Sequence, residues 1–155
     1  MKRKNMLKIT KSTILTLLLI FTAIFLTLYN NGNFEKLKSE NSGIPDLVNS
    51  ISSNSDYSLT VIANSDTIES KEDFARTVIT MCRENAFKTL QFSTDLGGYP
   101  TSLDITVYLH QEDIRASEPV CNIQYMPIGT SKEFDIKNHP EQFRLYLDGK
   151  EIEYF

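Results

Sequence analysis

The two cysteines, Cys82 and Cys121, are the residues of this 155-residue chain that could do redox chemistry. They lie far apart in the sequence and form no Cys-x-x-Cys motif, so a dithiol oxidoreductase is not indicated. Cys82 falls on the inward face of a predicted helix, and Cys121 falls on the inward face of a predicted strand. Two alternatives stay open: a disulfide between them, which an extracytoplasmic compartment permits, or two buried free thiols that pack as small apolar groups.

The histidines and nearby carboxylates are the candidates for acid–base or metal chemistry. The chain has two histidines, His110 and His139, and their positions give no metal-ligand spacing. Asp104 and His110 share the outer face of one predicted strand, but no nucleophile and no G-x-S-x-G motif accompanies them. The sequence therefore predicts no catalytic residue, no metal site and no bound cofactor.

A glycine-containing loop, Gly97, Gly98 and Tyr99, is the candidate binding loop. It lies between predicted strands rather than at the start of a helix, so it is not a phosphate-binding loop. An aromatic side chain on a connection with adjacent glycines can carry recognition. The simpler alternative is a plain turn between strands.

The domain that holds these residues follows a hydrophobic segment, residues 12–29, which contains no charged residue, glycine or proline. As a helix, 18 residues span about 27 Å, which is within the accepted range for a bilayer core of about 30 Å. Residues 1–11 contain five cations and no acidic residue, and the cations are Lys2, Arg3, Lys4, Lys8 and Lys11. The positive-inside rule places residues 1–11 in the cytoplasm and the domain outside. We therefore expect a single-pass signal anchor in the cell membrane.

A cleaved signal peptide is the alternative interpretation of residues 12–29. The apolar region of a signal peptide is usually about 7–15 residues long and ends at a small-x-small cleavage site. No Ala-x-Ala pattern follows this segment, which favours the uncleaved anchor. Cleavage would instead give a secreted domain, which is extracytoplasmic as well.

Residues 30–56 predict a flexible stalk between the anchor and the domain. Residues 41–56 include five serines, three asparagines, one glycine and one proline, a composition that buries little apolar surface. Two alternatives stay open for Leu47, Val48 and Ile51 after Pro45: a segment without regular structure, which the composition favours, or a short helical turn.

Residues 57–155 predict one folded domain. Apolar residues alternate in strand segments, and they recur at helical spacing in one segment with Ser70 as its cap. The expected elements are a strand at 57–63, a helix at 71–85, a strand around Leu90 and Phe92, a strand at 103–109 and a strand at 120–126.

The C-terminus predicts a β-hairpin, because Asp148-Gly149 favours a two-residue type I′ turn. Pairing outward from this turn sets Leu147 against Lys150, Tyr146 against Glu151, Leu145 against Ile152, Arg144 against Glu153 and Phe143 against Tyr154. The fold class is therefore α+β: a two-layer domain with one amphipathic helix on a mainly antiparallel sheet, in the order β-α-β-β-β plus the terminal hairpin.

The charge distribution excludes one class of partner. Since five of the 16 Lys and Arg residues precede the hydrophobic segment, the rest of the chain has 11 of them against 20 Asp and Glu, a net charge of −9. A domain this acidic is unsuited to nucleic acid. We expect an interaction or accessory module that is held in the lipid bilayer by residues 12–29 and binds another envelope protein. The alternatives are a small-ligand-binding domain and an envelope enzyme whose site is assembled only by the fold.

Overall fold

The computed structural model describes residues 20, 22, 42–94, 98–129 and 133–154. Residues 40–155 form one compact unit, which contains the folded domain. Apart from Ile20 and Thr22, both helical, the predicted anchor at 12–29 lies outside the described residues, as do the basic residues 1–11. Within the described part of the chain, no helix is both long enough and apolar enough to cross a bilayer.

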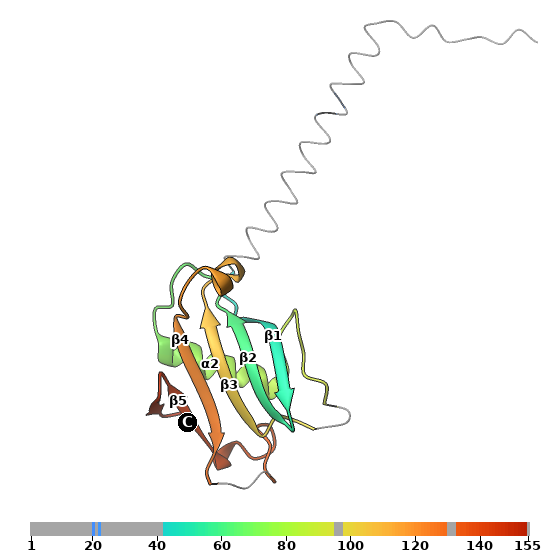
Figure 1. Cartoon of the computed structure of the whole chain (residues 1–155), viewed down its shortest axis with the longest axis vertical. Helices are drawn as coiled ribbons and strands as arrows, with labels where there is room; N and C mark the ends of the chain where they lie inside the picture. Colours follow the sequence, from blue (N-terminus) through green and yellow to red (C-terminus); the bar gives the residue numbers. More distant parts are fainter. Residues whose placement is uncertain (1–19, 21, 23–41, 95–97, 130–132, 155) are drawn as a thin grey trace, which may run out of the picture. The chain divides into compact units, whose positions relative to one another are not determined.

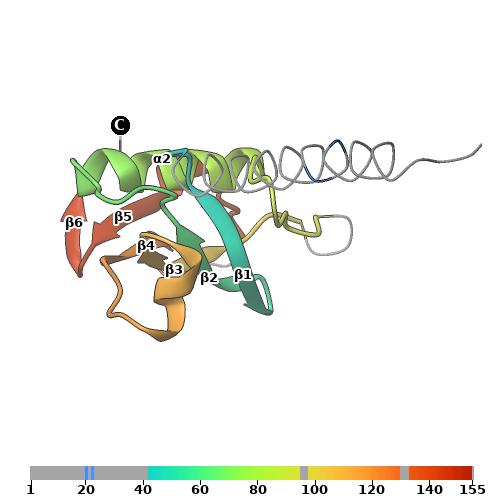
Figure 2. The same ribbon diagram turned by 90° about the horizontal axis from the view of Figure 1, so that it is seen from above.

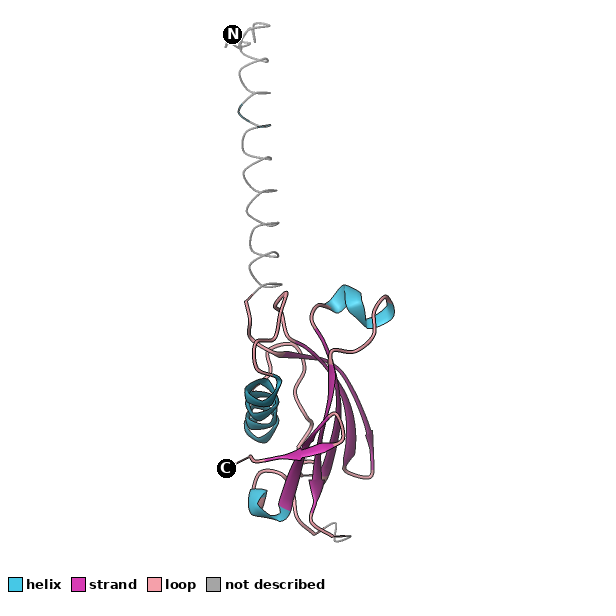
Figure 3. Cartoon of the chain, turned by 90° about the vertical axis from the view of Figure 1, so that its left-hand side faces the viewer, coloured by secondary structure: helices cyan, strands magenta, loops and turns pink. Residues whose placement is uncertain are grey.

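One helix packs on one face of a six-stranded sheet (Figures 1–3). The strands lie in sequence order, and neighbours are antiparallel except β2 and β3, which are parallel. The parallel pair needs a crossover, and helix α2 supplies it. The elements are β1 (Asp46–Ser53), β2 (Asp56–Ile62), α2 (Lys71–Glu84), β3 (Ser102–Tyr108), η1 (Gln111–Arg115), β4 (Cys121–Pro127), η2 (Pro140–Gln142), β5 (Phe143–Leu147) and β6 (Lys150–Ile152). This confirms a mixed α+β domain with one helix on a mainly antiparallel sheet.

Helix α2 begins and ends at residues suited to those positions. The Ser70 hydroxyl accepts a hydrogen bond from the Asp73 backbone N–H at 3.2 Å, which satisfies a donor that the first turn leaves unpaired. Asn85 ends the helix in the left-handed conformation, which asparagine tolerates better than most residues. The buried side of α2 consists of Ala75, Val78, Ile79 and Cys82, as the apolar spacing predicts.

The core lies between α2 and the sheet. Alternate residues of the central strands point toward the helix and are buried: Leu59 and Val61 in β2, Leu103, Ile105 and Val107 in β3, Cys121, Ile123 and Tyr125 in β4, and Leu145 in β5. The period of two that predicts these strands is therefore confirmed.

The predicted stalk, residues 30–56, is wrong from Asp46 onward. Residues 46–53 form β1, which pairs with β2 through a two-residue turn at Asn54 and Ser55. Leu47 is fully buried in the core. Since residues 46–53 are a strand, the alternative of a helical turn is wrong as well. The serine-rich composition misled the prediction because an edge strand with one solvent-facing side can be built largely from small polar residues.

The predicted strand around Leu90 and Phe92 is also wrong. Phe92 is held outside the sheet by the Asn85 side chain, which donates to the Phe92 carbonyl at 3.1 Å and accepts from its N–H at 2.8 Å. The Phe92 ring contacts Tyr57, with 5.2 Å between ring centroids. A side chain thus satisfies the backbone groups that a neighbouring strand would otherwise pair.

The terminal hairpin is confirmed next to its turn. Leu145, Tyr146 and Leu147 pair as predicted, and Asp148 and Gly149 both have positive φ, as a type I′ turn requires. The outer part of the register differs, because β6 ends at Ile152.

Arg144 consequently has a different partner from the predicted one. Its guanidinium lies 3.4 Å from the carboxylate of Glu151, not beside Glu153. The backbone carbonyl of Glu153 instead accepts a hydrogen bond from the Arg76 side chain of α2 at 2.8 Å.

Candidate functional site

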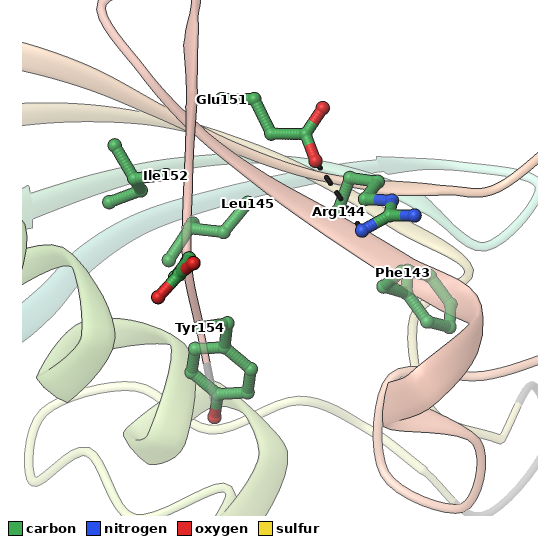
Figure 4. Close-up of a pocket in the computed structure, with 7 residues that line it drawn as sticks. Phe143, Arg144, Leu145, Glu151, Ile152 and Tyr154 are labelled. Carbon is green, nitrogen blue, oxygen red and sulfur yellow. Dashed lines mark ion pairs between the residues drawn. The ribbon is translucent and has the colours of Figure 1, made fainter.

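An open groove lies between β5, β6 and the C-terminal residues that follow β6 (Figure 4). We call it the β5–β6 groove. Its volume is about 430 Å³, and its walls are Phe143, Arg144, Leu145, Glu151, Ile152, Glu153 and Tyr154.

The groove exists because β6 is shorter than β5. β6 pairs with residues 145–147, so within the described part of the chain the start of β5 has no neighbouring strand on that side. Beyond Ile152 the chain turns to α2, where Arg76 binds the Glu153 carbonyl and Arg83 donates to the Tyr154 hydroxyl at 3.1 Å. Two arginines of the helix therefore hold the C-terminal residues away from β5.

The groove combines an apolar floor with a charged rim. Phe143 and Leu145 are buried, and Ile152 and Tyr154 are half-buried beside them. The rim carries the Arg144–Glu151 ion pair, in which both side chains are about half exposed. Such an exposed pair contributes little to stability and opens easily, so its charges are available to a bound molecule.

A second, smaller cavity of about 320 Å³ lies at the start of α2. It is lined by Gly43, Ala63, Ser65, Thr67, Ile68, Glu69, Ser70, Asp73, Phe74 and Thr77. Its walls mix polar residues with the apolar side chains of Ala63, Ile68 and Phe74, and they come from the loop before the helix, from the first turns of α2 and from Gly43.

Cys82 and Cys121 are both buried free thiols in the structure. Burial raises the pKa of the Cys82 thiol far above its usual range. Burial also raises the pKa of Cys121 to about 11, with a further contribution from Asp148 and opposition from Lys71. The thiolate is the reactive form of cysteine, so neither residue is an activated nucleophile.

Asp104 and His110 do not form a catalytic pair. Asp104 accepts a hydrogen bond from the Asn122 side chain at 2.8 Å. His110 lies 3.0 Å from the Asp66 carboxylate instead.

His139 is separate from both of these contacts. Its ring contacts Phe134, and its Nδ1 atom is buried without a hydrogen-bond partner among the described residues. No three metal-ligating side chains cluster among the residues that the structure describes.

The candidate binding loop is only partly described, because Gly97 lies outside the described residues. Gly98 has a φ of +68°, which favours glycine. Tyr99 is half-buried against the core, and its hydroxyl accepts a hydrogen bond from Lys137 at 2.8 Å. The Lys137 ammonium also lies 4.5 Å from the centre of the Tyr99 ring. Tyr99 is therefore held by Lys137, and its role in binding stays a prediction.

The groove residues were missed as a site because the sequence assigns them all to a hairpin. The alternation in residues 143–154 continues past Ile152, so Glu153 and Tyr154 resemble strand residues. What ends the strand is the pair of arginines on α2, at a distance in sequence that no local pattern reveals. No family model matches this chain, and neither the curated proteins nor the solved structures compared with it give a match.

Proposed function

We propose that this chain is a membrane-anchored interaction module whose extracytoplasmic domain binds another envelope protein through the β5–β6 groove. The hydrophobic segment 12–29 and the cations before it support the anchor and its orientation. The groove, with its apolar floor beneath a charged rim, is the observation that carries the binding role.

The chemistry of the groove favours an extended segment that carries an apolar side chain beside a lysine or arginine. The half-buried side chains of Ile152 and Tyr154 on the floor can contact the apolar side chain. The rim carries two carboxylates, Glu151 and Glu153, against the single guanidinium of Arg144. A cationic residue of the partner would therefore complement the rim, and the net charge of −9 after Lys11 favours its approach.

Such a contact is weak by itself, which suits a reversible accessory role. Burying one isoleucine or leucine side chain contributes about 1.5–3 kcal/mol. Anchoring both proteins in one membrane raises their effective concentration and offsets a low intrinsic affinity.

Site-specific photo-crosslinking in the native cells tests the binding role. A photoreactive residue at position 144 of the full-length chain should crosslink to one discrete envelope protein. The same residue at position 112, an exposed site in η1, is the matched control and should give none. Glu151→Lys should weaken the crosslink from position 144. Equal crosslinking from both positions would contradict binding in the groove.

Protease added to intact cells or spheroplasts tests the orientation. It should degrade the C-terminal domain, and a protected domain would contradict the proposal. Mass spectrometry should find the N-terminal residues still attached to the domain. A mature chain that begins near Asn31 would instead show a secreted protein.

A further inference from the structure

Strand β1 forms the edge of the sheet opposite to β6 (Figure 2). Ser53 and Asp56 flank the two-residue turn and face one another across the hairpin. In an antiparallel pair joined in this way, every second residue bonds to the neighbouring strand and the residues between them point their N–H and C=O groups outward. Asn49, Ile51 and Ser53 therefore bond toward β2, and Ser50 and Ser52 present their backbone groups at the edge.

Within the described part of the chain, β2 is the one strand that pairs with β1, and Ser50 and Ser52 make no backbone hydrogen bond outside that pairing. Natural edge strands are usually protected by a lysine, a proline or a covering segment. Residues 47–53 contain no charged residue and no proline. The carboxylate of Asp46, just before them, accepts hydrogen bonds from the backbone N–H groups of Lys88 and Thr89. A β-bulge, another such protection, interrupts β1 between Leu47 and Asn49. From Asn49 to Ser53 the edge has no charged residue, no proline and, within the described part of the chain, no strand paired on its outer side.

Ile51 adds an exposed apolar side chain to this edge. It is 63% exposed. It pairs with Ser58, which is also exposed, on the face of the sheet away from α2. No neighbouring strand in the described part of the chain covers it on the outer side of β1. The strand thus offers unpaired backbone groups on both sides of one uncovered isoleucine.

We propose that β1 pairs antiparallel with β1 of a second copy of this chain, around a two-fold axis at Ile51. This register sets Ser50 opposite Ser52 of the second copy, and Ser52 opposite Ser50. All four outward N–H and C=O groups of each copy then form hydrogen bonds. Ile51 faces Ile51 of the second copy at a non-hydrogen-bonded position, where side chains approach most closely.

This register is favoured because a two-fold contact must be complementary to itself. Pairing centred on Ser50 or Ser52 would leave some of the four groups unpaired and would set Ile51 opposite a small polar residue. The contact also contains no charge, although the chain after Lys11 carries a net charge of −9. The paired residues therefore set no like charges opposite one another, and the β5–β6 groove of each copy stays at the far edge of its sheet.

The contact is small, so the inference rests on the proposed anchor. A stable interface in solution usually buries about 1,200 Å² or more, and edge pairing over residues 49–53 is smaller than that. Two copies anchored in one membrane meet at a high effective concentration. Dimers are therefore expected in the membrane and not in a dilute solution of the domain.

Cysteine crosslinking of the full-length chain in phospholipid vesicles tests this register. After oxidation with copper phenanthroline, Ile51→Cys should form a covalent dimer, because its Cβ atom lies within disulfide reach of its equivalent. Ser53→Cys is the matched control, since Ser53 would lie opposite Asn49 of the second copy and out of reach of Ser53. We expect roughly tenfold more dimer for Ile51→Cys than for this control. The unsubstituted chain gives the background, because Cys82 and Cys121 are buried.

A second substitution, Ser52→Pro, is added to the Ile51→Cys chain. It distinguishes crosslinking through β1–β1 pairing from crosslinking through chance collisions of two chains. The Ser52 N–H points outward, so the monomer loses no hydrogen bond of the sheet while the dimer loses two. Dimer should fall to background while the thermal unfolding midpoint of the monomer stays within a few degrees of its parent. Equal crosslinking of Ile51→Cys and Ser53→Cys, no crosslinking of inserted chains, or indifference to Ser52→Pro would each overturn the dimer. Those results would leave partner binding in the groove unaffected, whereas a chain that washes off the vesicles would overturn the anchor and the dimer together.

Discussion

Two adjacent residues of β5, Arg144 and Leu145, lie in opposite environments. Replacing them should therefore have very different effects on the stability of the protein. Leu145 is 1% exposed in the core, whereas Arg144 is exposed and contacts Glu151 across the hairpin. Leu145→Asp places an unpaired charge in the core and should lower the free energy of unfolding by about 3 kcal/mol or more. Arg144→Ala should cost well under about 1 kcal/mol, because exposed ion pairs are weak.

Urea melts of the domain measure both changes. If Arg144→Ala were the more damaging of the two, the side chains of β5 would have to face the opposite way, as a one-residue shift in register would require.

The buried cysteines should make the domain less stable at alkaline pH. In the unfolded chain a thiol titrates near pH ~8.5, but in the native state burial raises the pKa of Cys121 to about 11 and that of Cys82 further. Between these values the unfolded chain releases protons that the native state keeps, so native stability falls as pH rises. The urea midpoint should be constant from pH 7 to pH 8 and then fall toward pH 11.

A matched variant identifies which group causes the loss of stability at alkaline pH. Cys121→Ala should reduce the slope of stability against pH above pH ~8.5, because it removes one of the groups that the native state keeps protonated. Thiol reagents at pH 8 should react slowly with the native protein and rapidly once it unfolds. Fast labelling of the native protein would contradict the burial of both thiols.

The β1–β2 hairpin has a turn that glycine would fit better. Asn54 and Ser55 both have positive φ, at 52° and 73°, a conformation in which serine is strained and glycine is not. Ser55→Gly should therefore raise the free energy of unfolding by about 0.5–1 kcal/mol.

The terminal hairpin supplies the control for this change, because it already has Gly149 at the equivalent position of its turn, with a φ of +79°. Gly149→Val should destabilise the protein by about 1 kcal/mol or more. Thermal unfolding measures both variants. A loss of stability in Ser55→Gly would mean that the serine side chain stabilises the turn more than its backbone strain costs.

The boundary of the folded molecule can be tested by truncation. The sequence alone suggests that residues 1 to about 50 can be removed without loss of the fold. In the structure the folded domain begins before residue 50, because Leu47 is buried in the core and the Asn64 side chain donates a hydrogen bond to the Ile44 carbonyl at 2.9 Å. A chain that starts at residue 40 should unfold cooperatively in urea.

A chain that starts at Tyr57 is the comparison, because it lacks β1. It should lose several kcal/mol of stability, since removing Leu47 alone leaves a core cavity that costs about 2–5 kcal/mol. If the two chains were equally stable, β1 would not belong to the cooperative unit.

The sequence determined the features that depend on neighbouring residues. The helix from Lys71 is set by Ser70 and by apolar residues at helical spacing. The terminal turn is set by Asp148-Gly149. In both, the hydrogen bonds and the buried face involve residues within a few positions of one another, so a local pattern is sufficient to predict them.

The tertiary structure decided the features that depend on distant partners. β1 is a strand because β2 pairs with it, although its serine-rich composition suggests a stalk. Phe92 lies outside the sheet because the Asn85 side chain takes its backbone groups. The β5–β6 groove opens because Arg76 on α2 binds the Glu153 carbonyl, 77 residues away in sequence. Strand pairing and side-chain capture are interactions between segments that only the folded chain brings together, so composition and period could not show them.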